Sequence, residues 1–195
     1  MQFIVARRWS PPFNLARDPI SDLGNSACGP YSGRYVCSPL HALMNGSFVA
    51  LGVAMIVGCV LESCAAPRTL ARSIGFTFLG VGGVGTILVG IFPENTSPLL
   101  HGVGAAMPFL LGNVGLSVLG LGSALSRPLR VVALIAGLGS LIALALFVRA
   151  NYLGLGDGGM ERLVAYPQTV WLIMLGVIRL KCPPGEGRTG PPIIT

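Results

Sequence analysis

A few ionisable side chains interrupt an otherwise apolar sequence, and they mark where chemistry could occur. Glu94 and His101 lie in and beside a short polar turn, Phe-Pro-Glu-Asn-Thr-Ser-Pro, between two apolar runs. Carboxylate and imidazole groups pass protons and ligate divalent metals such as zinc. Four residues are candidate ligands for one divalent metal, namely Asp22, His41, Glu94 and His101. The full set of candidate site residues is Ser21, Asp22, His41, Glu94, His101, Glu161 and Arg162.

The composition predicts an integral membrane protein. Of the 195 residues, 52% are hydrophobic and 10% are charged, and the mean hydropathy is +0.74. Soluble domains carry about 25% charged residues, so this chain lacks the polar surface to cover a water-facing globule. The formal net charge is +6, but the basic residues are scattered singly among apolar runs. This pattern excludes a nucleic-acid partner and leaves the lipid bilayer as the surrounding medium.

Five apolar runs predict an all-α fold, a polytopic helical membrane protein built as a bundle of five transmembrane helices. We expect the spans near residues 42–61, 73–92, 101–121, 131–148 and 163–178. Three regions follow: an extracytoplasmic loop segment over 1–40, the transmembrane domain over 41–180, and a disordered cytoplasmic tail over 181–195. The glycine-rich residues 149–162 are expected to form a flexible loop before the last span.

Small residues recur along the spans and predict close helix packing. In the first span, Gly46, Ala50, Ala54 and Gly58 share one face, which is a candidate surface for a partner helix or a homo-oligomer. The run over residues 80–85 matches the G-x-G-x-x-G spacing of dinucleotide-binding turns. That motif needs a strand before it and a helix opening after it, whereas this run lies within a span. We therefore interpret these glycines as packing residues.

The basic residues of the short loops orient the bundle. Arg68 and Arg72 follow the first span, and Arg127 and Arg130 follow the third, whereas the turn around Glu94 contains neither Lys nor Arg. Because basic loops stay in the cytoplasm, the carboxyl terminus is expected there and the amino terminus outside. The candidate site residues then meet at the outer face of a cell membrane. Polar groups at that depth are costly and often functional.

Two cysteines bracket a turn-rich segment on the side that we place outside. Cys28 and Cys37 are nine residues apart across Gly-Pro and Ser-Gly turns, so they are a disulfide candidate. An oxidising compartment would preserve such a bond. The alternative is two free thiols.

Several short motifs resemble a known family when they are taken in order. They are Pro19-Ile20-Ser21-Asp22-Leu23-Gly24, Ser38-Pro39-Leu40-His41, Phe92-Pro93-Glu94 with His101, and Glu161-Arg162 with Trp171. Over about residues 9–178 they resemble an uncharacterised bacterial multi-pass membrane family, domain of unknown function 998. The resemblance implies a six-helix bundle whose first helix precedes the Ile-Ser-Asp-Leu-Gly segment. Residues 1–6 then look like the last turn of that helix, which indicates a more upstream start or a truncation. The resemblance implies no activity.

Three functions stay open from the sequence, and whether the protein is an enzyme stays open with them. The first is a scaffold or partner-binding role, in which the charges form ion pairs and helix caps. The second is a transporter or accessory permease, in which the same residues relay protons or substrate. The third is a membrane-embedded metal-dependent hydrolase acting on lipid through a metal-bound water. We favour the first, because surface charges usually carry no chemistry.

Overall fold

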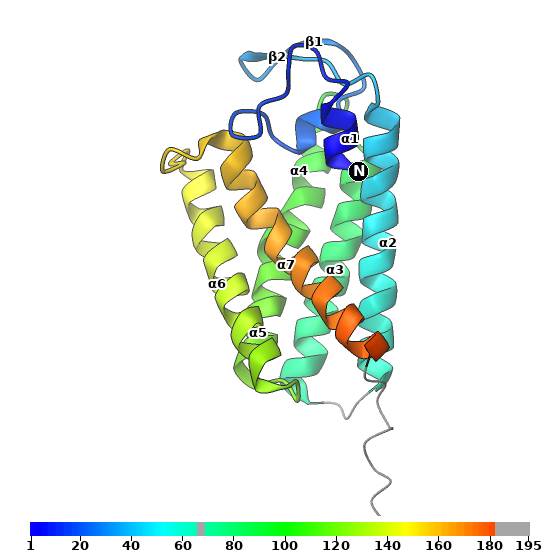
Figure 1. Ribbon diagram of the computed structural model, residues 1–195, viewed down its shortest axis with the longest axis vertical. Helices are drawn as coiled ribbons and strands as arrows, with labels where there is room; N and C mark the ends of the chain where they lie inside the picture. The colour runs from blue at the N-terminus through cyan, green and yellow to red at the C-terminus, as the bar shows by residue number, and fades with distance from the viewer. Residues whose placement is uncertain (66–68, 182–195) are drawn as a thin grey trace, which may run out of the picture.

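Five long helices form one bundle in the computed structural model, which describes residues 1–65 and 69–181 (Figure 1). The bundle consists of α2 (His41–Ala65), α3 (Leu70–Ile91), α4 (Pro98–Ala106) continued by η2 (Met107–Gly112) and α5 (Asn113–Gly122), α6 (Arg127–Val148) and α7 (Gly156–Lys181). Each of the five is long and apolar enough to cross a membrane. The predicted all-α, multi-pass architecture is confirmed. The predicted disordered tail lies outside the described residues, except for Lys181.

The third span changes its helical geometry at Pro108. The segment η2 is a π-helix that begins one residue before this proline, which cannot donate the usual backbone hydrogen bond. Glycines of α3 pack against it, since a Cβ atom on Gly85 would lie 2.5 Å from Cβ of Met107 and 2.7 Å from Cδ of Pro108. The glycine run over residues 80–85 thus lies inside a helix, where it permits close packing.

The small-residue face predicted on the first span does not pack against its neighbour in the bundle. Helices α2 and α3 meet instead through Gly52 and Gly83, where a Cβ on Gly83 would lie 2.8 Å from the carbonyl oxygen of Gly52. Gly46, Ala50 and Ala54 are exposed on another face of α2. The close contact between α2 and α3 therefore uses a different face of α2, and a partner helix or second copy on the predicted face stays a prediction.

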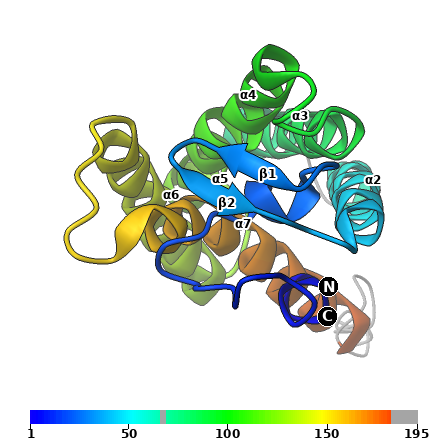
Figure 2. The ribbon, with the colours of Figure 1, turned by 90° about the horizontal axis from the view of Figure 1, so that it is seen from above.

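Residues 7–40, which we call the cap, fold across one end of the bundle (Figures 1 and 2). They follow the short helix α1 (Gln2–Ala6) and contain a 3-10 turn, η1 (Ser21–Gly24), and an antiparallel hairpin of β1 (Gly29–Tyr31) and β2 (Arg34–Val36). The sequence predicted only loop here. The hairpin forms because Ser32 and Gly33 both adopt positive φ, which a two-residue turn requires. Cys28 and Cys37 are disulfide-bonded at its base, with Cα atoms 4.2 Å apart.

The last helix begins earlier than the sequence predicted, which shortens the expected loop over 149–162 to residues 149–155. α7 starts at Gly156, so Glu161 and Arg162 lie on its first two turns. The glycines there serve close approach rather than flexibility. A Cβ on Gly158 would lie 2.6 Å from the backbone carbonyl carbon of Asp18, so the cap can settle on α7 only where side chains are absent.

Candidate functional site

Ser21 connects a buried carboxyl group to a buried imidazole at the cap end of the bundle. Glu161 of α7, which is only 4% exposed, accepts the backbone N–H of Ile20, and its Oε1 lies 2.8 Å from the Ser21 hydroxyl oxygen. That hydroxyl oxygen also lies 3.2 Å from Nε2 of His101 on α4. Nδ1 of His101 lies 2.9 Å from the carbonyl oxygen of Phe92. We call Glu161, Ser21 and His101 the Ser21 trio.

The hydrogen bonds of the Ser21 trio require one proton more than an ionised Glu161 and a neutral His101 would hold together. The Phe92 carbonyl only accepts, so Nδ1 of His101 carries a hydrogen. Ser21 has a single hydroxyl hydrogen, which can serve Glu161 or His101 but not both. Both links form if Glu161 is protonated and donates to Ser21, or if His101 is protonated at Nε2 and donates to Ser21. Either way, the trio holds one proton beyond an ionised carboxyl and a neutral imidazole.

A second buried group joins two carboxyl groups and an arginine. Asp22 on η1 is fully buried, and its two carboxylate oxygens accept hydrogen bonds from Nε and Nη2 of Arg34 at 2.5 and 3.1 Å. Glu94 also faces Asp22, and it accepts the side-chain amide of Asn25 at 3.1 Å. Burial, and then the neighbouring Asp22, raise the pKa of Glu94 to about 9. Glu94 is therefore a neutral acid at pH 7, and Arg34 forms its short ion pair with Asp22.

Arg162 ties the cap to α7 without pairing with its neighbour Glu161. Its Nη1 donates to the carbonyl oxygens of Leu15, Asp18 and Gly158 at 2.8, 3.0 and 2.6 Å. Three carbonyls from two segments thus share one cationic group. Glu161 and Arg162 thus contact the cap separately, although they are neighbours in the sequence.

The four residues proposed as metal ligands are not assembled into one site. His41 turns Nδ1 toward the carbonyl oxygen of Ser38 at 3.0 Å. Both ring nitrogens of His101 are engaged, Nδ1 with the Phe92 carbonyl oxygen and Nε2 with Ser21. Asp22 is engaged by Arg34. Across residues 1–65 and 69–181, no group of three or more His, Cys, Asp or Glu side chains could hold a metal ion. The placement of Asp22 beside Glu94, and of Ser21 beside His101, joins distant parts of the chain in pairs instead.

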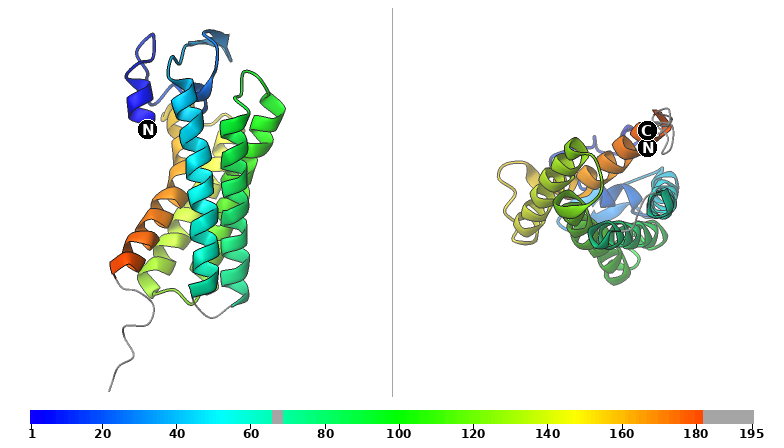
Figure 3. Two further views of the ribbon diagram at one scale, coloured as in Figure 1. Left: turned by 90° about the vertical axis from the view of Figure 1, so that its right-hand side faces the viewer. Right: turned by 90° about the horizontal axis from the view of Figure 1, so that it is seen from below.

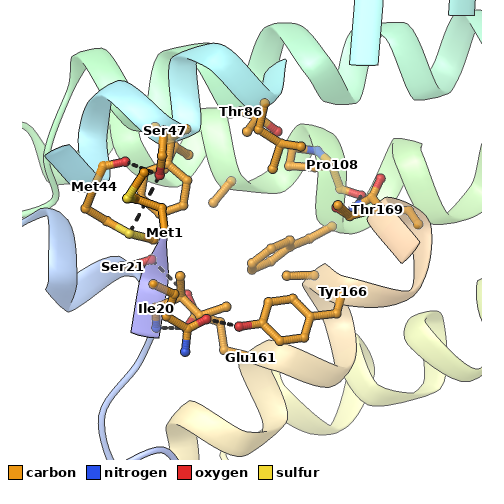
Figure 4. Close-up of a pocket in the computed structure, with 18 of the residues that line it drawn as sticks. Met1, Ile20, Ser21, Met44, Ser47, Thr86, Pro108, Glu161, Tyr166 and Thr169 are labelled. Carbon is orange, nitrogen blue, oxygen red and sulfur yellow. Dashed lines mark hydrogen bonds between the residues drawn. The ribbon is translucent and has the colours of Figure 1, made fainter. Parts of the chain in front are cut away.

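A cavity of about 420 Å³ lies directly beneath the cap and reaches Ser21 and Glu161 (Figure 4). Its walls are mainly apolar and come from α1, α2, α3, α4, η2 and α7. Gln168 of α7 reaches it as a buried amide whose Nε2 donates to the carbonyl oxygen of Pro108 at 3.1 Å. Its Oε1 has no hydrogen-bond partner among the described residues. The cavity therefore combines an apolar body with a few polar groups, as binding sites for amphiphiles do.

Sequence reasoning missed three residues of this region. Arg34 counted only as a loop charge, yet it is the counter-ion of Asp22. Asn25 and Gln168 were not singled out, although buried amides commonly mark polar networks. A sequence signal for Arg34 was present, because it is the one basic residue inside the loop that a Cys28–Cys37 disulfide closes.

The fold and the buried polar groups define a multi-pass helical membrane protein with a structured cap. Residues 1–178 match the family described as Protein of unknown function (DUF998), so the chain belongs to this family. This confirms the resemblance inferred from the ordered motifs. No curated protein and no solved structure matches the chain significantly.

Proposed function

We propose that this protein is a non-enzymatic scaffold of the cell membrane, which presents its cap to a partner. One observation carries the proposal: the candidate site side chains are bonded to the cap and to one another. Glu161 holds Ile20 and Ser21, and Arg162 holds carbonyl oxygens of the cap. Charged groups used in this way fix a shape, and they are not free to act on a substrate.

The outer surface of the cap supplies groups suited to a partner. Tyr35 and Leu15 are 56% and 46% exposed, and the Arg17 side chain is also exposed. Tyrosine and arginine are enriched where proteins bind one another. The basic short loops support an outward-facing cap and a cytoplasmic carboxyl terminus. The bond between Cys28 and Cys37 suits the same orientation, because disulfides persist in oxidising compartments.

Site-specific photocrosslinking in native membranes tests the proposal. A crosslinking amino acid is placed at Leu15 or Tyr35 on the cap, and at Ile135 of α6, which is 69% exposed on the helix bundle, as a matched control. We expect the same discrete protein adduct from both cap positions and a different pattern from Ile135. If folded protein gives no adduct from either cap position, the scaffold proposal is wrong.

A proton relay, in a transporter or accessory permease, is the second candidate. The specific observation in its favour is the proton shared by the Ser21 trio beside the cavity. In proteoliposomes, such a relay would give proton flux that Glu161→Gln abolishes, because the amide cannot release a proton. If wild-type and variant proteins leave the internal pH equally unchanged, the relay is excluded.

A further inference from the structure

A groove runs between α2 and α7 for most of their length. Helix α7 slants across the bundle, lying beside α2 at the end away from the cap and diverging from it toward the cap (Figures 1 and 3). Below the cavity under the cap lies a second cavity of about 470 Å³, lined by residues of α2 and α7. Leu51, Met55 and Thr169 line both cavities, so the two adjoin between α2 and α7.

The lower part of this groove is apolar and lacks side chains that could fill it. Gly58 of α2 and Gly176 of α7 both line it, together with Ala54. A Cβ atom added at either glycine would meet no atom of the described chain within 4 Å. In a bilayer, apolar space that opens between two membrane helices is filled by hydrocarbon, since water finds no hydrogen-bond partners there.

The end of the groove away from the cap carries more positive than negative charge. Glu62 lines its lower end and is paired with both Arg72 and Arg179, so one carboxylate faces two guanidinium groups. Arg72 is buried, whereas the Arg179 side chain also lines the groove and is 31% exposed. Lys181, at the end of α7, is exposed nearby. An anionic group at this end would therefore meet Arg179 first.

We propose that the α2–α7 groove binds an anionic phospholipid, with one acyl chain along the groove and the phosphate at Arg179. The apolar walls and the charged end match the two halves of such a molecule. Guanidinium groups bind phosphate with fixed geometry, and each basic side chain near an anionic headgroup strengthens binding. This site lies at the opposite end of the bundle from the cap, so it stands independently of the scaffold role.

Native mass spectrometry of the purified full chain tests this inference with two probes, phosphatidylglycerol and phosphatidylcholine of identical acyl chains. One variant, Gly58→Leu with Gly176→Leu, fills the groove without touching Arg179. Its matched control is Gly46→Leu with Gly139→Leu, at two exposed glycines that also meet no described atom within 4 Å and line neither cavity. A third variant, Arg179→Gln, removes one positive charge from the groove end.

We expect wild type and the Gly46/Gly139 control to prefer phosphatidylglycerol, and the filled groove to lose binding of both lipids. Removal of one basic charge at the headgroup should weaken phosphatidylglycerol binding about fivefold and weaken phosphatidylcholine binding less, because the choline cation already offsets the phosphate charge. If all variants retained the two lipids equally, the binding would be that of non-specific membrane lipid, and the inference would be overturned. A stable dimer that Gly58→Leu with Gly176→Leu breaks apart would also overturn it, because a second copy would then occupy the groove.

Discussion

The sharpest prediction concerns Glu161, which we hold responsible for fastening the cap to α7. Glu161→Ala removes the acceptor for the Ile20 N–H and the partner of the Ser21 hydroxyl, both in a buried setting. Leaving a buried polar group without its partner costs about 1–3 kcal/mol, and two groups lose a partner here, so we expect a loss of about 3 kcal/mol from cap stability. Glu161→Gln is the matched variant, because its amide can occupy the same volume.

The glutamine variant should satisfy every link without the shared proton. The Oε1 atom of the glutamine accepts the Ile20 N–H, and its Nε2 donates to the Ser21 hydroxyl oxygen. The Ser21 hydroxyl then donates to Nε2 of His101. We expect a loss of about 1 kcal/mol or less. Hydrogen exchange of the cap amides measures both free energies directly, because local opening of the cap exposes them. If Glu161→Gln costs as much as Glu161→Ala, the proton count for the Ser21 trio is wrong.

Three further predictions follow from the cap and the bundle. The pKa of Glu94 rises from 4.5 to about 9 on folding. Between these pH values the Glu94 carboxyl group is therefore protonated in the folded protein and ionised in the unfolded chain. The free energy of unfolding should therefore fall with rising pH across that window, by at most about 1.4 kcal/mol per pH unit. Glu94→Gln should abolish this slope in pH-dependent unfolding, and an unchanged slope would refute the raised pKa of Glu94. Replacing Cys28 and Cys37 by serine should cost the cap about 2–3 kcal/mol in hydrogen exchange, and unchanged exchange would contradict this. Gly85→Leu should destabilise the bundle by about 3 kcal/mol in thermal unfolding, whereas Gly139→Leu should have little effect; equal effects would argue against the packing at Pro108.

The number and type of the long helices could be predicted because both depend on local composition. Runs of about twenty apolar residues specify a membrane helix whatever surrounds them. The start of α7 could not be predicted, because its glycines look like a flexible loop until the cap is placed against Gly158. In the same way, Gly46 to Gly58 signalled close packing, but which face of α2 meets α3 depends on the whole bundle.

The candidate site was predicted in its location and not in its pairings. Topology alone brings the candidate site residues, including both histidines, to one end of the bundle, since successive loops alternate between the two membrane surfaces. Which side chains meet depends on the path of the cap, which the sequence does not specify. Thus Asp22 pairs with Arg34, an arginine that looked like a loop charge, and His41 lies against Ser38.

If the buried polar groups serve to hold a partner-binding cap, then loosening the cap should weaken partner binding to the same degree. Crosslinking from Tyr35 and hydrogen-exchange protection of the cap are measured together in wild type, Glu161→Gln, Glu161→Ala and Asp22→Asn. The scaffold account predicts that adduct yield falls in step with cap protection across the four proteins. A variant with wild-type cap protection that loses the adduct would show that these side chains act directly, and would contradict the account.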